Sequence, residues 1–282
     1  MSELSTSAAA PELAKAQAKP GLPALWARLR RRPLLLSIAS FVALMVVWEL
    51  GGRGGNPLLT SHPSAVYESF LAQVDSGALP RAFIQSLQPL LYGYGLAIVV
   101  GIPIGLLLGR YWTAQAGLGF YFVALDATPI IAFLPLFILW FGLHLKVKIV
   151  IVFLFSLTPI VINTWMGVKG VPKTLVEVGK AFAGSESYIM RKIVLPHALP
   201  SVMTGLRLGI GRAIIAMAVA ELFTALTGLG GLLLRRSEDY DTAGMLVPAL
   251  VFMAMGIVLV GLVSWLERHI APWHRATSAS GE

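Results

Sequence analysis

Long apolar segments, separated by short polar stretches, make up most of the chain. A helix needs about 20 mostly apolar residues to cross the hydrocarbon core of a bilayer, which is about 30 Å thick. Six segments meet or approach this length, and the second, fourth and sixth contain no charged residue. The pattern predicts an all-α membrane protein with six transmembrane helices, at about residues 34–50, 90–109, 118–141, 149–168, 199–226 and 243–266.

Two of these segments have unusual features. The third contains Pro129 and Pro135, which favour a kinked helix or one with an unwound stretch. The first is short and ends with Glu49, but no small-x-small cleavage pattern follows it, so we expect a membrane helix rather than a cleaved signal peptide. Between the spans, residues 63–74 suit a short amphipathic helix, and residues 228–231 suit a turn at the outer surface.

The composition agrees with a membrane protein. Of the 282 residues, 56% are hydrophobic and 13% are charged, whereas about a quarter of the residues in a soluble domain are charged. This balance disfavours a soluble enzyme and excludes a disordered chain. The chain has no cysteine, which excludes a disulfide framework and a thiolate metal site.

The positive charge follows the membrane topology. If the N-terminus is inside, fourteen of the 22 Lys and Arg residues fall in inner segments and six in outer loops. Because short cytoplasmic loops carry an excess of Lys and Arg, both termini are predicted to be cytoplasmic. We expect cytoplasmic tails at 1–32 and 271–282 around a transmembrane domain at 33–270. The net charge of +8 is therefore interpreted as topology, and no nucleic-acid partner is expected.

Small residues recur at every fourth position in the second and fifth segments. Such stripes let helix backbones approach closely in a bilayer. Close packing is the simpler interpretation, and a face on which helix groups slide during transport is the alternative. The stripes consist of Gly93, Ala97, Gly101, Gly105 and Gly109, and of Gly205, Gly209 and Ala213.

Four charged residues lie within predicted spans: Asp126, Arg207, Arg212 and Glu221. A charge inside a bilayer is costly, so these side chains are expected to face the bundle interior or a wet cavity. Arg212 and Glu221 are nine residues apart, on opposite faces of one helix. Each needs a partner from elsewhere, for which Asp126 is one candidate. Two interpretations stay open: structural ion pairs, or a translocation pathway that helps to hold an anion.

The longest inner loop, residues 169–198, is expected to contain two short helices. Pro172 suits a first helical position, Gly184 is expected to end the first helix, and Ser185 to cap the second. The second helix is predicted at about 186–194, ending before Pro196. A polar loop with this much local order is a candidate docking surface.

This loop resembles the EAA loop of permease subunits of bacterial ABC importers. It carries EVG at 177–179 and IVLP at 193–196. Val178 and Gly179 replace the two alanines of the family pattern, and Ala183 stands where the family has glycine. The similarity covers about residues 56–270. The stretches 86–109 and 129–142, and the run from 205 to 230, resemble the nitrate, sulfonate, taurine and bicarbonate branch.

The resemblance implies a type I ABC importer permease of the bacterial inner membrane, with defined partners. These are a second copy of the permease, two ATPase subunits that bind ATP and Mg²⁺, and a solute-binding protein outside. Residues 173–184 would form the coupling helix, which sits in a cleft on the ATPase. The residues carried over to this contact are Lys173, Glu177, Lys180, Phe182 and Gly184.

No other motif assigns chemistry to the chain itself. Residues 167–174 read GVKGVPKT, but Pro172 replaces a glycine of the phosphate-binding loop and lacks the N–H that would cradle phosphate. The five histidines show no metal-ligand spacing, so no cofactor is expected in this chain. An intramembrane enzyme would need the carboxylates of Asp126 and Glu221 to converge.

The transported solute is expected to be a small anion, such as a sulfonate, taurine or nitrate. A permease for a vitamin or pyrimidine precursor is an alternative within the same family. The remaining alternative is a secondary transporter, which would function without an ATPase.

Overall fold

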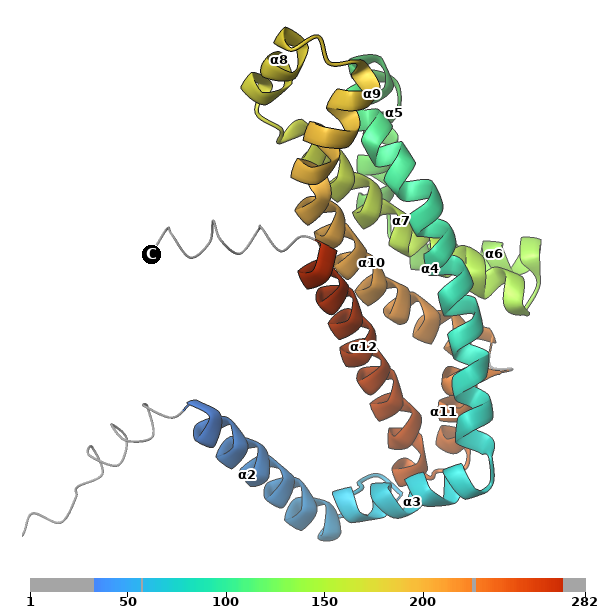
Figure 1. Cartoon of the computed structure of the whole chain (residues 1–282). Helices are drawn as coiled ribbons and strands as arrows, with labels where there is room; N and C mark the ends of the chain where they lie inside the picture. Colours follow the sequence, from blue (N-terminus) through green and yellow to red (C-terminus); the bar gives the residue numbers. More distant parts are fainter. Residues whose placement is uncertain (1–32, 57, 225–226, 271–282) are drawn as a thin grey trace, which may run out of the picture.

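The computed structural model describes residues 33–56, 58–224 and 227–270, and within these ranges the chain is helical without strands (Figure 1). The expected tails at 1–32 and 271–282 lie outside the described residues. Five helices are long and apolar enough to cross a membrane, or six if one bent pair counts as a span. The elements are α2 Pro33–Arg53, α3 Pro63–Asp75, α4 Ala78–Arg110, α5 Trp112–Ala127, η1 Ile130–Phe133, α6 Leu134–Phe141, α7 Leu145–Lys169, α8 Lys173–Ala181, α9 Glu186–Ile189, η2 Met190–Val194, α10 Leu195–Thr224, α11 Gly228–Glu238 and α12 Thr242–Ile270.

Helix α7 packs against both α4 and α10 (Figure 1). The small residues of α4 face α7 so closely that a Cβ atom added at Gly93 would lie 2.7 Å from Cβ of Val152. A Cβ atom at Gly105 would lie 2.7 Å from the carbonyl oxygen of Val161. Since real Cβ atoms do not approach other atoms this closely, the glycines are needed for the α4–α7 contact.

The second stripe contacts the same central helix. A Cβ atom added at Gly205 of α10 would lie 3.0 Å from the carbonyl oxygen of Pro159, and one at Gly209 would lie 3.1 Å from Cγ1 of Ile160. The predicted close packing is thus confirmed for both stripes. The contacts join backbone to backbone, and α4, α7 and α10 form a tightly packed unit.

The third predicted span is not one kinked helix. Helix α5 and the segment from η1 through α6 are bent by 85°. The break falls at Thr128 and Pro129, where the chain leaves the α-helix and enters a short 3-10 turn. Pro135 does not interrupt a helix, because it lies in the first turn of α6, where a missing N–H is tolerated. The predicted interruption is confirmed at Pro129 and is wrong at Pro135.

Several helix boundaries differ from the predicted ones. Helix α4 begins at Ala78, a turn after α3 ends, so it extends well beyond the predicted 90–109. The amphipathic helix expected at 63–74 is confirmed as α3. The turn expected at 228–231 is wrong: these glycine-rich residues form the first turn of α11.

Helix α2 contacts the rest of the molecule at its C-terminal end (Figure 1). There, the Trp48 indole N–H donates to the carbonyl oxygen of Ser61 at 2.9 Å. The Glu49 carboxylate accepts from the backbone N–H of Ser64, in the first turn of α3, at 3.0 Å. None of the residues in the apolar window of α2 is buried within this chain, so its sides are free to contact lipid or another chain.

Candidate coupling loop and translocation pocket

Helices α8 and α9 stand together at one end of the molecule, which we call the α8 end, and α3 lies at the opposite end (Figure 1). Gly179 lets α8 lie close to the following segment, because a Cβ atom there would be 2.7 Å from Cδ1 of Ile193 and 3.2 Å from Cγ1 of Ile189. Gly179 stands where the family pattern has alanine, and an alanine methyl group here would require the ends of the Ile193 and Ile189 side chains to move.

A Schellman turn ends α8. The N–H of Gly184 donates to the carbonyl oxygen of Gly179 at 3.0 Å, and the N–H of Ala183 donates to that of Lys180 at 2.9 Å. The left-handed residue of this turn is Ala183, with φ 54°. The prediction that Gly184 itself ends the helix is therefore off by one residue. Gly184 is required for space, since its Cβ atom would lie 2.7 Å from the carbonyl oxygen of Gly179.

The outward face of α8 combines apolar and charged side chains. Phe182 is 85% exposed, and Leu175 and Val178 are also exposed. Glu177 is exposed and forms no ion pair with another residue in the described part of the chain. Lys173 and Lys180 are exposed as well. An exposed aromatic ring flanked by aliphatic and charged groups is typical of a surface that binds a protein partner.

The helix that follows α8 continues directly into a candidate membrane span. The Ser185 hydroxyl accepts from the N–H of Tyr188 at 3.2 Å, which confirms the predicted cap. The predicted end before Pro196 is wrong, because residues from Glu186 to Thr224 form one 39-residue helical stretch. A five-residue π-helical segment, η2, directly precedes Leu195 and Pro196. This wider turn accommodates a proline that cannot donate an N–H.

An ion pair links this loop to α4. The Arg110 guanidinium, at the last residue of α4, contacts the carboxylate of Glu186, the first residue of α9. The pair lies at the α8 end, where Glu186 is mostly exposed. It ties the second loop helix to the end of a different membrane helix.

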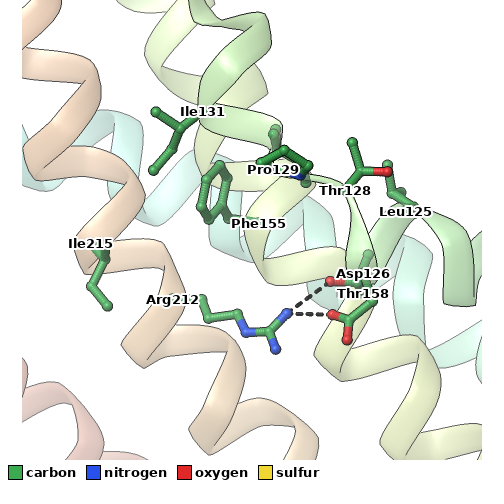
Figure 2. Close-up of a pocket in the computed structure, with 10 residues that line it drawn as sticks. Leu125, Asp126, Thr128, Pro129, Ile131, Phe155, Thr158, Arg212 and Ile215 are labelled. Atoms are coloured by element: carbon green, nitrogen blue, oxygen red, sulfur yellow. Dashed lines mark hydrogen bonds and ion pairs between the residues drawn. The ribbon is translucent and has the colours of Figure 1, made fainter.

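A pocket of about 280 Å³ opens between α5, η1, α7 and α10. Figure 2 shows the Arg212 side chain extending from α10 toward Asp126 and Thr158. The Arg212 guanidinium forms an ion pair with Asp126 and donates to the Thr158 hydroxyl at 3.3 Å. The rest of the wall is largely apolar, and it includes Ile131, Phe155 and Ile215.

Two of the four predicted charged residues thus meet in one pocket. Within this chain, the Arg212 side chain is 44% exposed and the Asp126 side chain is 32% exposed. The Asp126 partner that the sequence offered as one possibility is the one observed. Arg207 lies elsewhere: its guanidinium forms an ion pair with Glu267 of α12. It does not line this pocket.

Glu221 lies in a different environment, where its side chain is fully buried. The Ser86 hydroxyl contacts both carboxylate oxygens of Glu221, at 2.9 and 2.8 Å. The Lys148 ammonium is also buried and lies 3.4 Å from Oε1 of Glu221. We call Ser86, Lys148 and Glu221 the buried ionic cluster.

The buried ionic cluster holds the start of α11. The N–H of Leu229 donates to the Ser86 hydroxyl at 2.8 Å, and the N–H of Gly230 donates to Oε2 of Glu221 at 3.0 Å. The N–H of Gly228 donates to Oε1 of Gln85 at 3.0 Å. The first N–H groups of a helix have no partner within the helix. Here, side chains of α4 and α10 accept hydrogen bonds from these N–H groups. The Glu221 carboxylate also interacts favourably with the positive end of the helix dipole.

Sequence reasoning did not identify Lys148 or Ser86. The span predicted at 149–168 leaves Lys148 in an outer loop, but it is the fourth residue of α7 and also donates to the carbonyl oxygen of Thr227 at 3.0 Å. Serines occur in many membrane helices, and nothing in the pattern around Ser86 marks it as a partner of Glu221. The one available signal was that an intramembrane Glu needs a cationic partner.

The carboxylates of Asp126 and Glu221 do not converge. Asp126 contacts Arg212, which lies nine residues before Glu221 on α10, or about 13 Å along a helix at 1.5 Å per residue. Glu221 is sealed in the buried ionic cluster. The geometry therefore gives no support to an acid–base pair. Among the described residues, no group of three or more His, Asp or Glu side chains could hold a metal ion.

Helices long and apolar enough to cross a bilayer, with a loop at the α8 end and a pocket between them, are the features of a multi-pass membrane protein. Comparison with known proteins identifies its family. Residues 101–272 match the family described as binding-protein-dependent transport system inner membrane component, and the chain belongs to this family. It is therefore a permease subunit of an ABC importer of the inner membrane.

Relatives match along most of the chain. The formylaminopyrimidine transport permease protein ThiX of Halalkalibacterium halodurans is 30% identical over 241 residues, covering 83% of this chain and 94% of the relative. The taurine transport system permease protein TauC of Escherichia coli is 28% identical, covering 86% and 91%. The bicarbonate transport system permease protein CmpB of Synechococcus elongatus is 27% identical, covering 84% and 89%.

Solved structures support the fold. The MetNI methionine ABC transporter, in an inward-facing conformation, matches with a TM-score of 0.59 at 18% identity, covering 68% of this chain and 95% of that chain. An amino acid ABC transporter matches with a TM-score of 0.59 at 17% identity, covering 71% and 98%. The chain thus has the fold of a type I importer permease.

Proposed function

We propose that this permease is driven through the outward face of α8 by an ATPase subunit, and that it passes solute through the pocket at Arg212. In the proposed assembly, two copies of the chain stand on two ATPase subunits, which bind ATP and Mg²⁺. A solute-binding protein delivers solute at the opposite end. Membership of the importer family supports these partners, and the unburied sides of α2 leave surface for a second copy.

One observation carries the proposal: the continuous helical stretch from Glu186 to Thr224. It begins beside α8, whose Phe182 is exposed, and it holds Arg212 in the pocket. A helix transmits displacement along its axis because its backbone hydrogen bonds resist bending. Movement of α8 by a closing ATPase dimer would therefore shift Arg212 relative to Asp126. Such a shift provides the alternating access that import requires.

The solute is proposed to be small and polar, with an anionic group. Relatives named for transport of taurine and bicarbonate support this class. The relative named for formylaminopyrimidine supports the alternative of a pyrimidine precursor. The size of the pocket, about 280 Å³, is at or below the lower limit for drug-sized ligands. It suits a small solute of either kind.

Charged residues contribute unequally to this proposal. Asp126 and Arg212 line the pocket, and we assign them to the translocation pathway. Arg207 and Glu221 engage Glu267 and Lys148 away from it, and their geometry favours structural ion pairs. Lys173, Glu177, Lys180 and Phe182 are assigned to the ATPase contact, and Gly184 to the turn that shapes it.

The coupling role of α8 can be tested with Phe182→Ala and Glu177→Ala in the complex of permease, ATPase and binding protein. Removal of an aromatic anchor from an interface is expected to lower solute-stimulated ATP hydrolysis at least about tenfold. Glu177→Ala should weaken it less, as expected for a charge at the rim of an interface. Co-purification of the ATPase should weaken in parallel.

The matched control is Tyr111→Ala. Tyr111 is an exposed aromatic residue next to Arg110, at the same end of the molecule but not on α8. It should retain assembly and hydrolysis within about twofold, since contacts outside the centre of an interface contribute little. Unchanged assembly and hydrolysis in both α8 variants would contradict the coupling assignment.

A further inference from the structure

The ion pairs of this chain limit what its pocket can bind. Arg207, Arg212 and Lys148 each already face a carboxylate. The pocket therefore offers a simple anion no uncompensated cation. It presents a guanidinium, a carboxylate and a hydroxyl within one hydrogen-bonded group, surrounded by apolar walls.

A simple anion at Arg212 would have to displace Asp126. The displaced carboxylate would then lie beside a second negative charge and would lose its cationic partner. Both effects are unfavourable, and they are larger in a partly desolvated pocket than in water. The position of Asp126 thus disfavours solutes that carry only negative charge.

A zwitterion does not meet this obstacle. Its anionic group can take the place of the Asp126 carboxylate at Arg212, while its ammonium replaces the guanidinium at Asp126. Each charge of the opened ion pair then regains an opposite partner. Thr158 lines the pocket, and its hydroxyl accepts from Arg212, so it can hydrogen-bond to the solute in the same position.

We propose that Asp126, Arg212 and Thr158 form a selectivity subsite for small aliphatic zwitterions, in which a short chain joins an ammonium to a sulfonate or carboxylate. This inference rests on the proposed function, because it assumes that solute passes through this pocket. It deepens that proposal by assigning discrimination against simple anions to Asp126. Selection thereby occurs within the permease, in addition to any selection by the binding protein.

The test uses two probes that differ by one ammonium group, taurine and ethanesulfonate. Equilibrium binding of each is measured by titration calorimetry on the permease–ATPase complex without its binding protein. The wild-type complex should bind taurine at least about tenfold more tightly than ethanesulfonate, as expected for one charge-assisted contact. Equal affinity, a preference for ethanesulfonate, or no binding of taurine would overturn the proposal.

Variants assign the discrimination to individual residues. Asp126→Asn should reduce taurine affinity at least about tenfold and increase ethanesulfonate affinity, because Arg212 becomes uncompensated. Asp126→Glu retains the carboxylate and should retain the preference for taurine. Arg212→Gln should weaken binding of both probes. If Asp126→Asn leaves the taurine-to-ethanesulfonate ratio unchanged, the subsite is not as proposed.

Two controls separate this result from folding and from the proposed function. Arg207→Gln removes an arginine of the same helix that does not line the pocket, and it should leave the ratio unchanged within about twofold. Size-exclusion profile and helix content check that each variant is folded. ATP hydrolysis by the Phe182→Ala complex is recorded separately. Unchanged ATP hydrolysis in that complex, with an intact taurine-to-ethanesulfonate ratio in the wild type, would identify the coupling proposal as the wrong one.

Discussion

Two ionic groups share helix α10, and they occupy opposite environments. In the pocket, Arg212 and Asp126 are 44% and 32% exposed and are bordered by a cavity of about 280 Å³. In the buried ionic cluster, Lys148 and Glu221 are 2% and 0% exposed, and their neighbours satisfy the start of α11. Both groups are oppositely charged pairs inside a membrane protein. They differ in their surroundings: the pocket pair borders a cavity in which it can exchange partners, whereas the buried ionic cluster is enclosed by protein.

The difference shows why charge alone is a poor guide to a pathway. A buried pair contributes little net stability compared with an apolar pair, but removing one partner leaves an uncompensated charge. A pair that borders a cavity can exchange partners, because a solute that enters the cavity can replace either one. Exposure and an adjoining cavity, rather than charge, are therefore the grounds on which we propose a transport role for the pocket pair and a structural role for the buried ionic cluster.

The largest expected effect is on the buried ionic cluster. Glu221→Gln leaves the Lys148 ammonium buried without a carboxylate, and the free energy of unfolding should fall by about 3–5 kcal/mol. The double variant Lys148→Met/Glu221→Gln should recover a large part of that loss. Chemical unfolding of the purified permease in detergent measures both. Asp126→Asn serves as the matched carboxylate control and should change the free energy of unfolding by less than about 1 kcal/mol.

These measurements show whether the two ionic groups differ in their contribution to stability. If Asp126→Asn destabilises the permease as much as Glu221→Gln, the pocket pair is structural too. If the double variant is no more stable than Glu221→Gln, the unpaired ammonium is not the source of the loss.

A smaller loss of stability is expected when the packing around the buried ionic cluster is disturbed at Gly228. Gly228 has φ 87°, and a Cβ atom there would collide with the Glu221 carboxylate. Gly142 has a similar φ of 76° and no atom within 4 Å of such a Cβ. Both alanine variants carry backbone strain of about 1–3 kcal/mol. Gly228→Ala should lose a further amount of about 1–3 kcal/mol through overpacking, as measured by the same unfolding experiment. Equal losses would mean that the start of α11 is less constrained than the structure indicates.

The smallest expected change in stability is at Ala183, which lies outside both ionic groups. Ala183 adopts a left-handed conformation in the turn that ends α8. Ala183→Gly should remove strain of about 1–2 kcal/mol, offset by the greater conformational entropy of glycine in the unfolded chain, about 0.5–1 kcal/mol. A net stabilisation of about 0.5 kcal/mol is expected from thermal unfolding. A destabilised Ala183→Gly variant would argue against the left-handed turn.

The lengths of the apolar segments were sufficient to predict most of the fold. Uninterrupted apolar runs predicted α7 and α12 well, because a helix is the only open structure that satisfies its backbone within a bilayer. The Gly93 and Gly205 stripes predicted contacts that the structure confirms. The extension of α4 to Ala78 and the helix at Gly228 were missed, because tertiary partners rather than local sequence stabilise those ends.

The site was predictable only in part. Resemblance of the loop at 177–196 to a known family identified the candidate ATPase contact, and the structure adds the turn at Ala183 and the continuous helix through Pro196. The need for partners around Arg212 and Glu221 could be read from the sequence. Which partner belongs to which residue depends on helix rotation and crossing, and a single sequence does not specify these. Lys148 and Ser86 therefore emerged only from the structure.

The role of the pocket is tested most directly by the amount of solute that the reconstituted complex of permease, ATPase and binding protein imports per ATP hydrolysed. Taurine is the probe, and two arginines of α10 are compared in proteoliposomes. Arg212→Gln is predicted to lower this ratio at least about tenfold, since it removes one charge-assisted partner of the solute. Arg207→Gln, which alters a pair outside the pocket, is predicted to keep it within about twofold. An unchanged ratio for Arg212→Gln, or an equal loss in both variants, would contradict the assignment of the pocket to the translocation pathway.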